Sequence, residues 1–150
     1  MAHIHEKIDF TVEVFVVHSG KVLLRKHDKY GIWLSIGGHI KLDEDPNQAA
    51  VREVMEEVGL VIELYDTRSI RINTESFEEL IPPISVNRHR ISSNHEHVCL
   101  VYCAKSFTDE VIPEKNTDIW KWCSYEEIKM LEDIQENVVY YAERALDEVL

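Results

Sequence analysis

The sequence has few basic residues and no long apolar run, and each shortage excludes a class of protein. Lysine and arginine together number 16 against 28 aspartates and glutamates, so the formal net charge is −12 over 150 residues. A surface of that sign does not attract nucleic acid or an anionic membrane, so we expect neither as a partner. Since no run of about 18 apolar residues is present, we expect no transmembrane helix.

Cysteine is also scarce. Cys99, Cys103 and Cys123 show no Cys-x-x-Cys spacing, and three cysteines cannot close a complete set of disulfides. We therefore expect reduced, buried thiols and a cytoplasmic location. The length suits one domain over residues 1–150, because no linker long enough to divide the chain is present.

Strands and helices alternate irregularly along the predicted fold. Two β-rich runs within residues 8–28 flank the turn signal Ser19-Gly20, which predicts a β-hairpin. Residues 74–95 hold two prolines and the basic run NRHR, so we expect them to be irregular. The pattern favours an α/β (α+β) protein with a mixed sheet covered by helices. Strands are also predicted over 31–40, 61–72, 97–107 and 118–124, and helices over 43–60, 125–131 and 134–149.

The clearest helix is predicted between Asp45 and Gly59. Asp45 suits its N-cap, Pro46 its first turn and Gly59 its C-cap. We expect one face of this helix to enter the core and small residues on the other face to leave room for a ligand. The residues expected in the core are Val51, Val54, Met55 and Val58, and the small residues are Ala49 and Ala50.

Three carboxylates share a face of the same helix. Glu53, Glu56 and Glu57 stand at positions i, i+3 and i+4, where like charges repel and mildly destabilise a helix. Hydrated glutamates on a surface helix are common, so the triplet alone fits a solvated face. The alternative is a hard cation such as Mg²⁺, which binds one or two carboxylates together with phosphate oxygens and water.

The wider spacing favours the metal. Gly38 precedes Glu44 by five intervening residues, and seven more lead to Arg52-Glu53-Val54-Met55-Glu56-Glu57-Val58-Gly59-Leu60. This stretch resembles the Nudix box, G-x5-E-x7-R-E-U-x-E-E-x-G-U with U apolar, at every fixed position from Gly38 to Leu60. The resemblance implies an α/β/α sandwich around a central mixed β-sheet. It also implies a Mg²⁺-dependent hydrolase, with Mn²⁺ as a substitute ion. Its substrate would be a nucleoside diphosphate-linked compound or a nucleoside triphosphate, cleaved at a phosphoanhydride bond.

The resemblance also assigns roles to single residues. Arg52 would hold a glutamate of the loop and helix by a charge-assisted hydrogen bond, and Glu53 would bind metal or position the attacking water. Glu44 would support the loop and Gly59 would end the helix. The metal ligands implied are the Gly38 carbonyl, Glu53, Glu56 and Glu57.

Candidates for substrate binding lie outside the box. They are Arg25, His39, Arg88, Arg90 and Glu96, with Glu114 and Asp118 as further acids and Trp33, Tyr30 and Phe77 as aromatics that could stack on a base. For each of them, a solvated charge or a core aromatic is the competing interpretation. His95 and His97 would share a face of a strand and could bind Zn²⁺, but the sequence shows no third ligand beside them.

Two alternative functions remain open beside the hydrolase. One is a non-catalytic Nudix-fold module that binds a nucleotide or regulates a partner, although the intact box disfavours it. The other is a diphosphate isomerase of related fold, which needs a cysteine and a glutamate as proton donors. The expected partner is a small-molecule nucleotide or nucleoside diphosphate derivative, and a homodimer is compatible because homodimers are frequent in the family.

Overall fold

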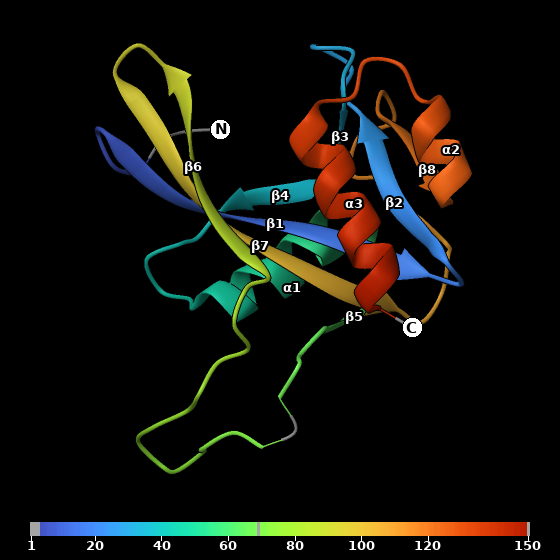
Figure 1. The fold of residues 1–150 in the computed structure, drawn as a ribbon. Coiled ribbons are helices and arrows are strands. Elements are labelled where there is room, and N and C mark those ends of the chain that lie inside the picture. Colours follow the sequence, from blue (N-terminus) through green and yellow to red (C-terminus); the bar gives the residue numbers. More distant parts are fainter. Residues whose placement is uncertain (1–3, 69, 150) are drawn as a thin grey trace.

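The computed structural model describes residues 4–68 and 70–149, and in them a mixed sheet of eight strands lies between helices on its two faces (Figure 1). Among these residues no helix combines the length and apolar character needed to cross a membrane. The expected α/β class and layered architecture are confirmed. The elements are β1 (Ile8–His18), β2 (Lys21–Lys26), β3 (Trp33–Leu34), β4 (Ile36–His39), α1 (Pro46–Val58), β5 (Ile62–Leu64), β6 (Ser85–Ser92), β7 (His95–Ser106), β8 (Ile119–Cys123), α2 (Tyr125–Met130) and α3 (Glu136–Glu148).

Strand β1 is the centre of the sheet. It runs parallel to β7 and antiparallel to β2 and β4, and the predicted hairpin turns through Ser19 (φ 48°) and Gly20 (φ 75°). Positive φ at both turn positions matches the twist of the flanking strands. Side chains of β1 alternate between two cores: one packs on α1, and the other packs on α2 and α3. The α1 core takes Val12, Val14 and Val16, whereas the other takes Phe15 and Val17.

The thiols follow the expectation. Cys99, Cys103 and Cys123 are free and buried, all within the core on the α3 side of the sheet. Burial raises the pKa of the Cys99 and Cys103 thiols to about 12, so both stay protonated.

The prediction of a long strand over residues 61–72 is wrong. Strand β5 covers only Ile62–Leu64, because its register with β7 extends for just three residues. Beyond it Ile70 and Ile72 are exposed, so the apolar residues that suggested a strand have no sheet to join.

The prediction that residues 74–95 are irregular is also wrong in part. Residues Ser85–Ser92 form β6, which pairs antiparallel with β7 from Ser85↔Val101 to Ser92↔His95. Most of its side chains are exposed and polar, so it lacks the apolar alternation that marks a strand in sequence. Backbone hydrogen bonds to β7 hold it in place.

The core face of α1 differs from the expected one. Val51 and Met55 are 41% and 45% exposed, whereas Ala49 and Ala50 are fully buried beside Val54. The helix is therefore rotated so that its alanines lie against the sheet. The same rotation brings Glu53 into the buried face, with an exposed fraction of 7%.

Candidate active site

The carboxylates of helix α1 lie against the glycine pair of β4, on the face of the sheet that α1 covers. A Cβ built on Gly38 would collide with the Glu53 carboxylate, and one on Gly37 would collide with the Val12 carbonyl. Neither glycine has positive φ, so the close approach of other atoms, and not the backbone conformation, requires glycine at both positions. The local sequence supports the placement, because Asp45 caps α1 through the amide of Gln48 and Gly59 ends the helix with φ 66°.

Arg52 ties the loop to the helix. Its Nη2 donates to Glu44 Oε1 at 2.7 Å and to the His39 carbonyl at 3.1 Å, while its Nη1 donates to Glu53 Oε1 and Glu56 Oε2, both at 3.0 Å. The hydrogen bonds to Glu44 raise the pKa of Arg52 above its ordinary value and lower the pKa of Glu44. This is the charge-assisted contact expected from the resemblance.

Glu57 lies deeper in the cluster. It accepts hydrogen bonds from the Gly37 amide at 3.1 Å and from Arg25 Nη1 at 3.2 Å. Burial raises its pKa to about 8, although the nearby Arg25 opposes the shift. Burial also raises the pKa of Glu53, whereas Glu56 keeps 47% of its side chain exposed. Because all the donors are oxygens, the set fits a hard divalent cation, whose charge would favour the ionised form of both buried carboxyls.

A large cavity adjoins this cluster across the glycine pair. Its volume is about 1050 Å³, which is large enough for a nucleotide-sized molecule, and Gly37 and Gly38 line it. The cavity lies on the α3 side of the sheet and also contacts Asn87 and Tyr141. The glycine pair is therefore a shared wall: the cavity is on one side and the carboxylates are on the other.

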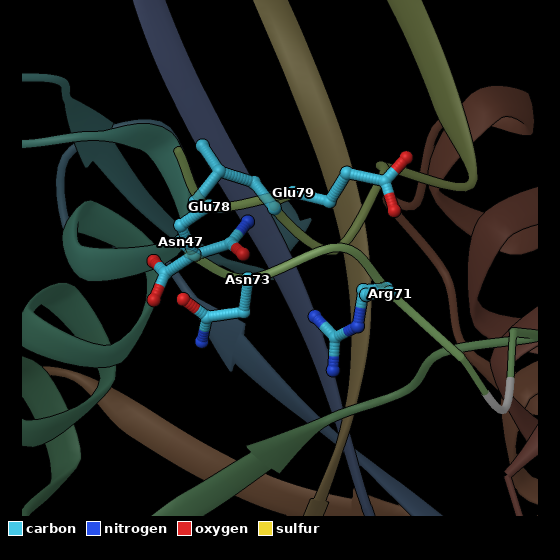
Figure 2. Close-up of a pocket in the computed structure, with 6 residues that line it drawn as sticks. Asn47, Arg71, Asn73, Glu78 and Glu79 are labelled. Carbon is cyan, nitrogen blue, oxygen red and sulfur yellow. The ribbon is translucent and has the colours of Figure 1, made fainter. Parts of the chain in front are cut away.

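Another cavity, of about 390 Å³, opens where the loop between β5 and β6 meets the start of α1 (Figure 2). Its side chains are strongly polar and include Asn47, Arg71 and Glu79. None of its described lining residues belongs to the box carboxylates. The larger cavity is therefore the candidate substrate site.

Among the cavity residues that sequence reasoning missed is an acid, Glu13. This carboxyl group is buried in the cavity wall, where it accepts a hydrogen bond from Ser35 Oγ at 2.7 Å and lies 3.8 Å from Cys99 Sγ. Burial raises its pKa. The available signal was a single acid within the apolar run of β1.

The candidates outside the box fall into two groups. Arg25 contacts the cluster, because its Nη1 lies 3.2 Å from Glu57 and 3.3 Å from Asp118, one of the additional acids. Arg88 and Arg90 line the cavity from β6, and Glu96 pairs with Arg88 at 3.6 Å. His39 also lines the cavity, but its ring contacts Asp9.

The remaining candidates are less close to the carboxylates. Glu114 donates its backbone N–H to the Glu57 carbonyl at 3.0 Å, whereas its side chain is exposed. Tyr30 lines the cavity, Trp33 packs in the core, and Phe77 is exposed in the loop before β6. Of the three aromatics, Tyr30 alone is placed at the candidate site.

Comparisons with known proteins bear on the family and the fold. The NUDIX domain family matches residues 8–143 of the chain. A NUDIX family hydrolase from Clostridium perfringens is 38% identical with a TM-score of 0.83, covering 93% of this chain and 96% of that one. A MutT NUDIX hydrolase from Burkholderia pseudomallei, 20% identical, has a TM-score of 0.67 over 97% of this chain and 100% of its own, which supports the fold alone.

A relative of known activity also matches. The CTP pyrophosphohydrolase of Escherichia coli (strain K12) is 30% identical over 99 residues, which cover 62% of this chain and 73% of that protein. The family match and these relatives identify an enzyme of the hydrolase class. The chain belongs to the Nudix family.

Proposed function

We propose that the chain hydrolyses a phosphoanhydride bond in a nucleoside triphosphate or a nucleoside diphosphate-linked small molecule, with Mg²⁺ as the cofactor and Mn²⁺ as its substitute. The observation that carries the proposal is the position of Glu53 and Glu57 directly across Gly37 and Gly38 from the large cavity. A phosphate group that extends from the cavity past the glycine pair meets the carboxylates that hold the metal. The pyrophosphohydrolase activity in the name of the Escherichia coli relative supports the same reaction class.

The donor set defines how the metal is held. The carboxylates of Glu53, Glu56 and Glu57 and the Gly38 carbonyl would bind the ion, which when bound supplies charge neutralisation at the phosphates and a more acidic water. Arg52 keeps Glu53 and Glu56 oriented toward one another, since one guanidinium contacts both.

Residues of the cavity bind the rest of the substrate. Arg88 and Arg90 border the cavity on β6, but their register partners Val98 and Glu96 place their side chains toward the α1 face, so we assign their guanidinium groups to phosphate or ribose oxygens outside the cavity rim. Arg25 restrains Glu57 through an ion pair, with its Nη1 3.2 Å from Glu57 Oε1. Glu13 lines the cavity, and we assign its carboxyl group to a hydrogen bond with the nucleobase.

A substrate screen tests the proposal. The purified protein is incubated with a panel of nucleoside triphosphates, including CTP, and of nucleoside diphosphate-linked compounds, in Mg²⁺ or in EDTA, and the products are resolved by mass. We expect cleavage at a phosphoanhydride that disappears in EDTA, returns in part with Mn²⁺ and is lost in E56Q and E57Q. A panel that shifts the melting temperature without any turnover would instead favour the non-catalytic binding module.

A further inference from the structure

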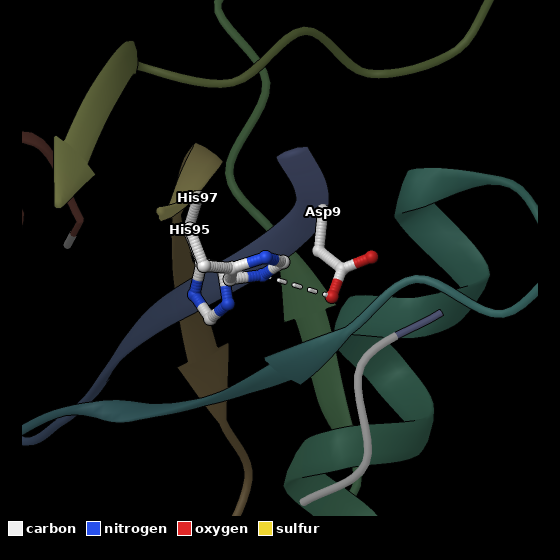
Figure 3. A group of neighbouring side chains, drawn as sticks. All are labelled: Asp9, His95 and His97. Carbon is white, nitrogen blue, oxygen red and sulfur yellow. Dashed lines mark ion pairs between the residues drawn. The ribbon is translucent and has the colours of Figure 1, made fainter. Parts of the chain in front are cut away.

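Four side chains from three strands gather at one end of the sheet face that carries α3. Asp9 on β1 and His97 on β7 are register partners, His95 lies two residues earlier on the same face of β7, and His39 comes from β4. We call this group the histidine cluster. Figure 3 shows the carboxylate of Asp9 beside the two rings of β7. Asp9, His39 and His95 are buried, and His97 is half-buried.

The spacing of the donor atoms fits a metal ion. One ligand atom from each of Asp9, His95 and His97 lies within 4.8 Å of the other two, and Asp9 Oδ2 is 3.3 Å from His95 Nε2. Ligand atoms about 2.0–2.2 Å from a tetrahedral zinc ion lie roughly 3.3–3.5 Å apart. The Asp9–His95 pair is therefore already at ligand spacing, and the ligand atom of His97 lies within 4.8 Å of both.

The groups around His95 favour a cation between it and Asp9. Its Nδ1 lies 3.0 Å from the Glu6 carbonyl oxygen, which can only accept, so Nδ1 carries a hydrogen. In the neutral ring the lone pair is then on Nε2, facing a carboxylate oxygen that is also an acceptor. The two acceptors attract only when a proton or a metal ion lies between them. This tautomer, with Nδ1–H held by a backbone carbonyl, is the one in which histidine binds metals.

The surrounding contacts resemble the support that metal ligands receive. The backbone N–H of His5 donates to Asp9 Oδ1 at 2.6 Å, and His39 Nε2 lies 3.1 Å from Asp9 Oδ2. These contacts fix the carboxylate in place. His97 lies among these groups, because its ring centroid is 5.3 Å from that of His95 and 4.9 Å from that of His39.

We propose that Asp9, His95 and His97 form a second metal site, selective for a zinc-class divalent ion, with His39 supporting Asp9. Two imidazole nitrogens and one carboxylate oxygen suit zinc, whereas the all-oxygen box suits Mg²⁺. Three protein ligands leave one tetrahedral position for water. The ion would pin residues 4–6 to the sheet, because the backbone of that segment already contacts Asp9 and His95. The site does not depend on the proposed reaction.

Metal titration tests the site. Zn²⁺ is titrated calorimetrically, in excess Mg²⁺, into wild type, the double variant E56Q/E57Q, and the single variants H95N, H97N and H89N. His89 is the matched control, because its ring lies 5.6 Å from that of His97 on the exposed strand β6 and outside the ligand set. We expect one tight equivalent in wild type, E56Q/E57Q and H89N. We expect affinity to fall by about 100-fold or more in H95N and H97N, since even the loss of a supporting group costs 10–100-fold.

Two further measurements extend the test, and the first of them needs no variant. Co²⁺ added to wild type should give the intense visible absorption of a tetrahedral site, and Zn²⁺ should raise the melting temperature of wild type and H89N but not of H97N. Metal uptake that vanishes in E56Q/E57Q and persists in H97N would assign the ion to the box and overturn the proposal. Wild type that shows no tetrahedral Co²⁺ spectrum would also overturn it.

Discussion

The box cluster and the histidine cluster lie on opposite faces of β4 and are assembled in opposite ways. We use the name box cluster for Glu44, Arg52, Glu53, Glu56 and Glu57. All of them come from one loop and the helix that follows it, whereas the histidine cluster joins residues 9, 39, 95 and 97 across three strands. A local cluster leaves a fixed spacing in the sequence. A cluster that forms only when strands pair does not.

The two clusters also differ in how their charge is balanced. In the box cluster Arg52 and the adjoining Arg25 offset part of the negative charge of the glutamates, and a guanidinium keeps its charge at any ordinary pH. In the histidine cluster Asp9 is surrounded by imidazoles, whose charge depends on a proton or a metal. Arg52 links the two sites through the His39 carbonyl. The comparison predicts that changes to the box cluster mainly lower turnover, whereas changes to the histidine cluster mainly lower stability.

The largest effect is expected for E57Q. The change removes a carboxylate that faces the glycine pair while keeping its shape, so kcat should fall by about 10³-fold, the cost of losing one strong electrostatic contact in an active site. Initial rates with saturating Mg²⁺ on the best substrate of the screen measure the effect. E63Q, on the exposed face of β5, is the control and should stay within about twofold of wild type. Equal losses in both variants would refute the role of Glu57.

Next in size is R52K. Lysine keeps the charge but cannot reach Glu44, Glu53 and Glu56 together, so the carboxylates lose their common anchor. We expect kcat/KM to fall by about 30-fold, a misplacement effect smaller than the loss of a ligand. Rates measured across Mg²⁺ concentrations separate weaker metal binding from slower chemistry. A wild-type rate in R52K would show that the box cluster does not depend on this arginine for its geometry.

The raised pKa of Glu57 also predicts how the stability of E57Q relative to wild type changes with pH. In metal-free protein the pKa of Glu57 is about 8 against an ordinary 4.5, so between these values the unfolded chain ionises first. The stabilising effect of the neutral carboxyl is full below pH 4.5 and is lost as pH rises toward 8. E57Q should therefore be relatively more stable than wild type at pH 8 than at pH 5 in EDTA, as measured by thermal unfolding. A gap independent of pH would contradict the raised pKa.

Much of the box cluster could be predicted from sequence, because a helix fixes the relation between its residues. The caps of α1 and the spacing of its glutamates follow from local geometry. The rotation of α1 could not be predicted in the same way, since Val51 and Met55 look as apolar as Val54. Which side a helix buries depends on the shape of the sheet that receives it.

The histidine cluster shows the opposite limit. His95-x-His97 was visible as a pair on one strand, but its third member, Asp9, lies 86 residues before His95 and becomes a neighbour only through the parallel register of β1 and β7. Glu13 was missed for the same reason, because its contacts with Ser35 and Cys99 form only in the folded sheet. Strand β6 was not predicted, because it pairs with β7 through backbone hydrogen bonds and its exposed, polar side chains show no apolar alternation.

A smaller effect, on stability, is expected for D9N. Asp9 is fully buried and accepts the amide hydrogens of Ile4 and His5, so the amide variant weakens these contacts and the attraction to the imidazoles. Without added zinc we expect a loss of about 2 kcal/mol, typical of a disrupted buried charged hydrogen bond. Urea unfolding measures it, with D43N on the exposed loop as the control. If D9N instead abolished turnover while unfolding at the wild-type midpoint, the contrast between the two clusters would fail.

The smallest effect is expected at the start of α1. Asp45 accepts the Gln48 amide at 2.9 Å, and the Gln48 side chain accepts the Asp45 amide in return, so D45A should cost about 1 kcal/mol of stability. D45N keeps a capping oxygen and should recover most of that loss in the same urea titration. Because the cap orders the helix without touching the carboxylates, kcat should stay within about twofold of wild type. Zinc affinity should not change at all, since the histidine cluster takes no residue from α1. A fall in zinc affinity in D45A would mean that the two sites communicate through β4 and are not independent.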